Sequence, residues 1–121
     1  MNLAVPLNFT AQAQAAGAAL HKITAPFGFM ITAVSLTPIA FTGTPTGFSI
    51  DVNVGATAAL AALAADVAGT PVNWKSRHHQ GDDEVIRVAK DATVTIDVNL
   101  TGGVTPTVTY DLILWIVQGT V

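Results

Sequence analysis

The sequence predicts an all-β fold, an antiparallel β-sandwich of about eight strands, in a chain of 121 residues. Two observations carry this prediction. Apolar and polar residues alternate with a period of two in several segments, which is typical of strands with one buried face. Short clusters of Gly and Pro separate these segments at the spacing found in sandwiches and barrels. The length fits one domain over residues 1–121, and residues 1–18 are also compatible with an extended arm.

The clearest alternation occurs in two segments, residues 48–54 and 93–101. In each, four apolar side chains share one face and polar side chains occupy the other; the apolar sets are Phe48, Ile50, Val52 and Val54, and Val94, Ile96, Val98 and Leu100. The stretches SIDVNV and TIDVNL within these segments echo each other. We expect both segments to be half-buried strands, each with its apolar side chains facing the core and its polar side chains facing outward.

The other strands are expected between turn signals. Turn signals, which combine Gly with Pro or Asp, lie in residues 43–47, 69–71, 81–83 and 102–106. Further strands are predicted near residues 3–10, 19–24, 29–41, 71–76, 84–88 and 107–117. Residues 56–65 are rich in Ala, which favours a helix, but the run is too short for a stable isolated helix. We therefore expect a strand or an irregular connection there.

Two of the predicted strands are apolar on both faces. In the first, Phe29, Ile31 and Ala33 alternate with Met30, Val34 and Leu36. In the second, over residues 107–117, the face that begins with polar residues continues as Ile113, Trp115 and Val117. A second layer of the same domain covers one face. The other face could be covered by a loop of the same chain or by a neighbouring subunit, and the subunit is favoured. The predicted subunit interface consists of Phe29, Ile31, Ile113, Trp115 and Val117.

The composition excludes several classes of function. Charged residues make up only 11% of the chain, against about 25% in an ordinary soluble domain. The net charge of −3 argues against a nucleic-acid partner, which requires a basic face. The absence of Cys excludes disulfides and thiolate-bound metals. Residues 23–50 carry no charge, but Pro interrupts them, so we expect neither a membrane span nor, with Lys22 as the first basic residue, a signal peptide.

The charges that are present are unevenly placed. Residues 75–97 hold nine of the thirteen Lys, Arg, Asp and Glu residues, around the stretch RHHQGDDE at 77–84. His and carboxylates are suitable ligands for zinc, manganese or iron. However, His78 and His79 are adjacent, and on an extended backbone adjacent side chains point to opposite faces. A solvated loop is therefore the favoured interpretation, and no metal site is predicted.

Two further site hypotheses are weaker. If the echoed strands lie side by side, Asp51 and Asp97 together with Asn53 and Asn99 could offer calcium its preferred oxygen ligands. The same alternation is typical of any exposed strand face, so this site is not predicted either. Trp74 or Trp115 could serve a carbohydrate-binding face, although Trp more commonly packs in a core or a subunit contact.

Nothing in the sequence indicates catalysis. The chain contains no nucleophile elbow, no phosphate-cradling glycine loop and no zinc-protease motif. The acids Asp82, Asp83 and Glu84 lie together on one turn, whereas a glycosidase needs two carboxylates held across a cleft. We expect a protein that is not an enzyme, with no catalytic residues and no cofactor.

Three stretches together resemble a known group of proteins. They are APFGFMI at 25–31, PTGFSIDVN at 45–53 and VAKDATVTIDV at 88–98. In this order, followed by a hydrophobic terminal strand, they are similar to small jelly-roll virion proteins of tailed bacteriophages. The resemblance covers roughly residues 20–118, and its strand-and-turn motifs are moderately specific.

The resemblance implies a jelly-roll β-sandwich and a structural function in the virion. The favoured role is a capsid decoration (cement) protein that forms a homotrimer, binds the major capsid protein and is made in the host cytoplasm. The alternatives are a receptor- or glycan-binding module of a tail fibre or spike, and a minor tail or connector protein. The capsid contact is expected in the N-terminal segment 1–18 or in the charged region, at Trp74, Lys75, Arg77, His78, His79, Asp82, Asp83, Glu84 and Arg87.

Overall fold

The computed structural model describes residues 5–79 and 82–119, and for residues 77–79 and 82–84 it describes the backbone. These residues form eleven strands and no helix, which confirms the all-β prediction. The strands are β1 (Val5–Gln14), β2 (Gly17–Thr24), β3 (Phe29–Thr42), β4 (Gly47–Val54), β5 (Thr57–Ala64), β6 (Val72–Lys75), β7 (Arg77–His79), β8 (Asp82–Glu84), β9 (Ile86–Val88), β10 (Thr93–Thr101) and β11 (Thr107–Gln118).

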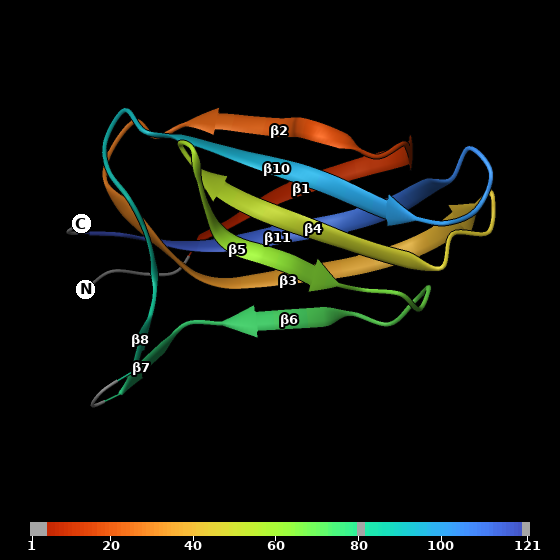
Figure 1. Cartoon of the computed structure of the whole chain (residues 1–121). Coiled ribbons are helices and arrows are strands. Elements are labelled where there is room, and N and C mark those ends of the chain that lie inside the picture. The colour runs from red at the N-terminus through yellow and green to blue at the C-terminus, as the bar shows by residue number, and fades with distance from the viewer. Residues whose placement is uncertain (1–4, 80–81, 120–121) are drawn as a thin grey trace.

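Nine of these strands form two antiparallel sheets that face each other as a sandwich (Figure 1). Sheet I has the order β1-β11-β3, followed at its edge by β6 and β9, and sheet II has the order β2-β10-β4-β5. With β6 and β9 counted as one strand, there are eight strand positions. The first then pairs with the eighth, the second with the seventh, the third with the sixth and the fourth with the fifth. This is a two-stranded ribbon wound into two layers, the arrangement of a jelly roll.

The sixth strand position is interrupted. β6 pairs with residues 33–36 of β3, and β9 pairs with residues 29–31 in the same direction. Between them, the Ser76 amide donates a 2.8 Å hydrogen bond to the Thr32 carbonyl. β6 and β9 are thus two parts of one line, and the hairpin of β7 and β8 leaves that line and projects from the edge of the sandwich (Figure 1).

The core lies between the sheets and contains inward-facing side chains from both. Its largest fully buried members are Tyr110, Phe29, Phe48, Ile31, Leu36, Ile50, Ile96, Leu112 and Leu114. Burying a large aliphatic or aromatic side chain contributes about 1.5–3 kcal/mol, so this set is the main source of stability. The echoed segments are β4 and β10, which lie side by side at the centre of sheet II with Asp51 opposite Asp97.

A β-bulge explains the apparent second apolar face of β3. Trp115 of β11 is opposite Ala33, and the next residue of β11 is opposite Ile31, so Thr32 is an extra residue. The bulge shifts the alternation by one residue. Phe29 and Ile31 before it and Val34 after it therefore all face the core, where they are at most 1% exposed. The two sets assigned to opposite faces of β3 are thus mixed: Ile31 and Val34 both face the core, and Met30 and Ala33 both face outward.

The alanine-rich run is the edge strand β5, in agreement with the expectation of a strand or connection. Leu60 and Leu63 are three residues apart, yet both pack against the core. They do so because the pairing with β4 shifts between them, next to Ala62, which has a φ of 54°. A helix-like spacing of apolar residues can thus arise from a bulged strand.

The same local structure recurs on three edge strands. Ala13 of β1, Ala19 of β2 and Ala62 of β5 have positive φ values of 48°, 53° and 54° at register shifts. Each of these amides donates a hydrogen bond to a side chain of the neighbouring inner strand: to Thr109 Oγ1 at 3.1 Å, Asp97 Oδ1 at 2.8 Å and Asp51 Oδ1 at 2.6 Å, respectively. Bulges of this kind make an edge a poor template for another strand.

The N-terminal segment contributes a full strand to sheet I. Within residues 1–18, the described part forms β1, which pairs with β11 from Val5 onward, and the first residues of β2. From Val5 on, this segment is therefore part of the sandwich.

Candidate interaction surfaces

The outer face of sheet I carries an apolar stripe. Residues of β11 alternate, with Leu112, Leu114 and Ile116 buried and Ile113, Trp115 and Val117 half-buried on the other side. The neighbouring strands add Met30 beside Val117 and Ala33 beside Trp115 on this face. We call Met30, Ala33, Ile113, Trp115 and Val117 the outer stripe. For β11, the prediction of apolar residues on both faces is confirmed.

The five residues predicted as a subunit interface do not share one surface. Ile113, Trp115 and Val117 lie on the outer stripe, where a second subunit can reach them. Phe29 and Ile31 are 1% and 0% exposed and fill the core of the single chain. Because of the bulge at Thr32, these two residues present no surface to a partner.

Opposite charges flank the outer stripe. Asp111 is exposed on β11, four residues before Trp115, or roughly 14 Å along the strand. Lys75 of β6 is exposed and lies opposite Ala33, which in turn lies opposite Trp115. Arg87 of β9 is exposed and lies opposite Met30. The face thus has an acidic end on β11 and a basic edge on β6 and β9.

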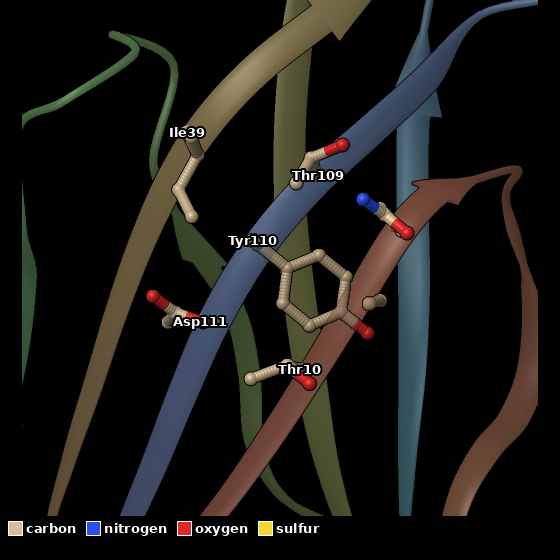
Figure 2. A pocket seen from close by; sticks show the side chains of 7 residues that line it. Thr10, Ile39, Thr109, Tyr110 and Asp111 are labelled. Atoms are coloured by element: carbon tan, nitrogen blue, oxygen red, sulfur yellow. The ribbon is translucent and has the colours of Figure 1, made fainter.

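A polar pocket of about 240 Å³ surrounds Asp111 (Figure 2). It lies where bulges on both sides meet β11: the β1 register shifts beyond Ala11, and the β3 register shifts at Ile39. These shifts hollow the face of the sheet. The pocket is lined by Thr10, Ala11, Gln12, Ile39, Thr109, Tyr110 and Asp111. Ile39 is 50% exposed and forms an apolar wall, while the carboxylate, two hydroxyls and an amide supply polar groups.

The predicted capsid contact is spread over different environments. Trp74 packs against the core from β6, so it is not primarily a surface residue. Lys75 and Arg87 are exposed on the outer face of sheet I. The other six residues lie in the β7–β8 hairpin, and their side chains are outside the part of the chain that the structure describes; they are Arg77, His78, His79, Asp82, Asp83 and Glu84.

The paired aspartates of sheet II have a structural use. Asp51 and Asp97 each accept a hydrogen bond from a bulge amide on an edge strand, at Ala62 and Ala19. Asn53 also donates to Asp97 Oδ2 at 2.9 Å. Three of the four carboxylate oxygens are thereby hydrogen-bonded within the sheet. No group of three or more His, Cys, Asp or Glu side chains that could hold a metal occurs within residues 5–79 and 82–119.

A polar pair, the half-buried His21 and the fully buried Tyr110, joins the two sheets. His21 Nε2 of β2 lies 2.7 Å from the Tyr110 hydroxyl of β11, and the two rings meet edge-on. Burial lowers the pKa of His21 below its ordinary value of 6.5 and raises the pKa of Tyr110 to about 12. Both groups are therefore neutral at pH 7, and which of them donates depends on which ring nitrogen of His21 carries the proton. Phe9 packs on the other side of His21, with ring centroids 5.1 Å apart.

A second pocket, of about 350 Å³, opens between the two sheets at the edge formed by β1 and β2. Its lining is mostly apolar, and the residues are Leu7, Asn8, Phe9, Ile23, Thr24, Pro26, Phe27, Phe29 and Ile116. Several of these side chains also pack against the core. The pocket is thus an open end of the core rather than a site with converging polar groups.

No protein-family model matches the chain, and no curated protein is detectably similar to it. No helix among the described residues is long and apolar enough to cross a membrane. The function is therefore inferred from the surfaces described above.

Sequence reasoning missed Asp111 and His21. Asp111 could have been singled out as the only charged residue in the strand 107–117. For His21 the signal was weaker, because a His in an alternating strand is equally compatible with an exposed position. The link between His21 and Tyr110 spans 89 residues and depends on the packing of the two sheets.

Proposed function

We propose that this protein is a structural component of a phage virion, a capsid decoration protein that self-associates as a homotrimer on the capsid. The observation that carries the proposal is the outer stripe. A jelly roll already covers the inner faces of its sheets, yet this one presents Ile113, Trp115 and Val117 together on an outer face. Contiguous apolar residues on a surface mark sites of protein association.

The scarcity of charge supports an assembly role. With 11% charged residues, the surface has little like-charge repulsion to keep copies apart. The strand order also fits the resemblance to jelly-roll virion proteins, since the fold that the resemblance implies is the fold present. A fold alone hosts many functions, so the role in the virion is argued from the surfaces.

The β7–β8 hairpin is the proposed contact with the major capsid protein. It projects from the edge of the sandwich at the interrupted strand position of sheet I (Figure 1). It also holds a large share of the charges in the chain, within RHHQGDDE. A polar projection at one end leaves the sheet face available for contacts between copies.

The test is binding of the purified protein to capsids assembled from the major capsid protein encoded in the same genome. We expect saturable binding at hundreds of copies per particle and loss of binding when residues 77–85 are removed. Failure of the intact protein to bind would contradict the decoration role. Full binding by the shortened variant would contradict the hairpin assignment alone. Removal of residues 1–18 is an unsuitable test, because it deletes β1 from sheet I.

A glycan-binding module of a tail fibre or spike is the second candidate. The observation in its favour is the pocket at Asp111, where hydroxyl, amide and carboxylate groups meet an apolar wall (Figure 2). Polar groups placed in a partly apolar concavity are common in ligand sites. Glycan-array binding that is lost in Asp111→Ala, with only a few copies per virion, would favour this candidate over decoration.

A further inference from the structure

We propose that the pocket at Asp111 receives the Lys75 side chain of a second copy of this chain. The inference rests on the proposed self-association and names the residues that direct it. The occupant is thus a primary ammonium group on a flexible apolar stem. It comes from strand β6, at the edge of sheet I in the second copy.

The chemistry of the pocket matches a lysine side chain. An ammonium group has three donors and no acceptor. Asp111, Thr10 and Thr109 line the pocket with a carboxylate and two hydroxyl oxygens that can accept them (Figure 2). Ile39, which is 50% exposed, offers an apolar wall for the methylene stem of the lysine. Asp111 is the only charged residue of the lining, so the pocket selects a positive group.

Both partners lack a counter-charge within the described part of the chain. No hydrogen bond or ion pair joins the side chain of Asp111 or of Lys75 to any residue within 5–79 and 82–119. Both side chains are exposed on the same face of sheet I. They lie too far apart to meet within one chain, since they are separated by two strand positions across the sheet and four residues along it.

The placement of the charges suits an association between copies. Asp111 lies at one end of the outer stripe and Lys75 lies at the far edge, with Trp115 and Ala33 between them. A contact that brings the acidic end of one copy to the basic edge of the next uses two different patches on each subunit. Such a head-to-tail contact forms a ring where the rotation between successive copies closes.

A charge exchange tests the proposal. We would measure the mass in solution of the full-length chain by light scattering over a concentration series, for the wild type, Asp111→Lys, Lys75→Asp and the double variant. The wild type should have a multiple of the 12.4 kDa chain mass. Each single variant should dissociate at a concentration at least about tenfold higher, because like charges then face each other. The double variant should associate as the wild type does.

Controls separate this contact from a general effect of charge. Lys22→Asp removes an exposed lysine from the outer side of sheet II and should leave association unchanged. Denaturant unfolding should give the same midpoint for all variants, since every substituted side chain is exposed. Raising the salt concentration should weaken the wild-type association.

Three results would overturn the proposal: a 12.4 kDa wild type at every concentration, single variants that associate normally, or a double variant that fails to recover. A glycan that binds at Asp111 of a monomeric protein would overturn it as well. The outcome is independent of the capsid assay. Capsid binding without a charge-exchange effect would refute this contact alone, and a charge-exchange effect without capsid binding would refute the decoration role alone.

Discussion

At the scale of single residues, the pair of His21 and Tyr110 is the chief polar contact of the core. Each sheet supplies one member of this pair, whose polar atoms lie 2.7 Å apart, and burial favours the neutral form of both. A buried side chain of this kind has a cost when it becomes charged, since burial penalises the charged form. The pair therefore makes the stability of the sandwich depend on pH in two separate ranges.

On the acid side, we expect His21 to destabilise the protein below about pH 6.5. Its pKa is lowered by burial, so in that range the unfolded chain binds a proton more readily than the folded one. The free energy of unfolding is thus highest above pH 6.5 and falls as the pH decreases toward the folded pKa. Urea unfolding at pH 7.5 and pH 5 measures the loss. In His21→Leu, the decrease in the free energy of unfolding between pH 7.5 and pH 5 should be smaller. An equal decrease in this variant would show that other titratable groups cause it.

On the alkaline side, we expect Tyr110 to destabilise the protein above about pH 10. The unfolded tyrosine ionises near 10.0, whereas burial raises the folded pKa to about 12. The folded chain retains the proton in this window, so the free energy of unfolding decreases as the pH increases. Tyr110→Phe should remove this dependence, at the cost of roughly 1 kcal/mol at pH 7 for the lost hydrogen bond. Thermal unfolding at pH 8 and pH 11 compares the two proteins.

At the scale of elements, the bulged edge strands carry a measurable strain. Ala62 has a φ of 54°, in the left-handed region where a residue with a Cβ costs about 1–2 kcal/mol. Its amide is nevertheless held by Asp51 at 2.6 Å. The hydrogen bond and the inward turn of Leu60 and Leu63 offset that cost, which is why an Ala-rich strand tolerates the conformation.

We expect Ala62→Gly to stabilise the protein by up to about 1 kcal/mol. Glycine adopts a positive φ readily, although its greater freedom in the unfolded chain removes part of the gain. Ala58→Gly is the matched control in the same strand, since Ala58 lies opposite Asn53 without a positive φ. It should destabilise by about 0.5–1 kcal/mol. Equal effects of both substitutions on the denaturant midpoint would argue against strain at Ala62.

The same bulges mark the limit of prediction from sequence. Alternation located the strands well, and β4 and β10 follow it without interruption. A bulge breaks the period, so the inward residues of β3 and β5 produced patterns that a two-faced strand or a helix would also give. Register shifts depend on partners distant in the sequence, as Thr32 opposite β11 shows. For the same reason, the pocket at Asp111 could not be foreseen.

At the scale of the whole molecule, the sandwich and the β7–β8 hairpin meet at the interrupted sixth strand position, between β6 and β9. Residues 72–75 pair with 36–33 of β3, Ser76 bonds to Thr32, and residues 86–88 pair with 31–29. Removal of residues 77–85 joins Ser76 directly to Ile86. On the side of β3 that faces away from β11, each residue from 29 to 36 then still has one partner. The pairing along this edge of β3 therefore needs no residue of the hairpin.

We expect the variant without residues 77–85 to keep the fold, with a free energy of unfolding within about 1 kcal/mol of the wild type. A shorter connection between β6 and β9 slightly lowers the entropic cost of closing the loop, which favours folding. Far-ultraviolet circular dichroism and denaturant unfolding provide the measurement. A control variant that also lacks Lys75 breaks the one-to-one pairing with β3 and should be less stable. An unfolded 77–85 variant would show that the hairpin supports the edge of sheet I.

The bulges on β1, β2 and β5 also have a consequence for colloidal behaviour. A chain with so few charges has little electrostatic protection against uncontrolled polymerisation, and its strands are rich in β-forming residues. Here backbone geometry supplies the protection that charge does not, because the irregular edges disfavour sheet extension by incoming strands. Polymerisation by adding strands to the sheet edges is disfavoured, whereas copies can still associate through the outer face of sheet I. We therefore expect the protein to tolerate a high local density with little conversion into fibrils.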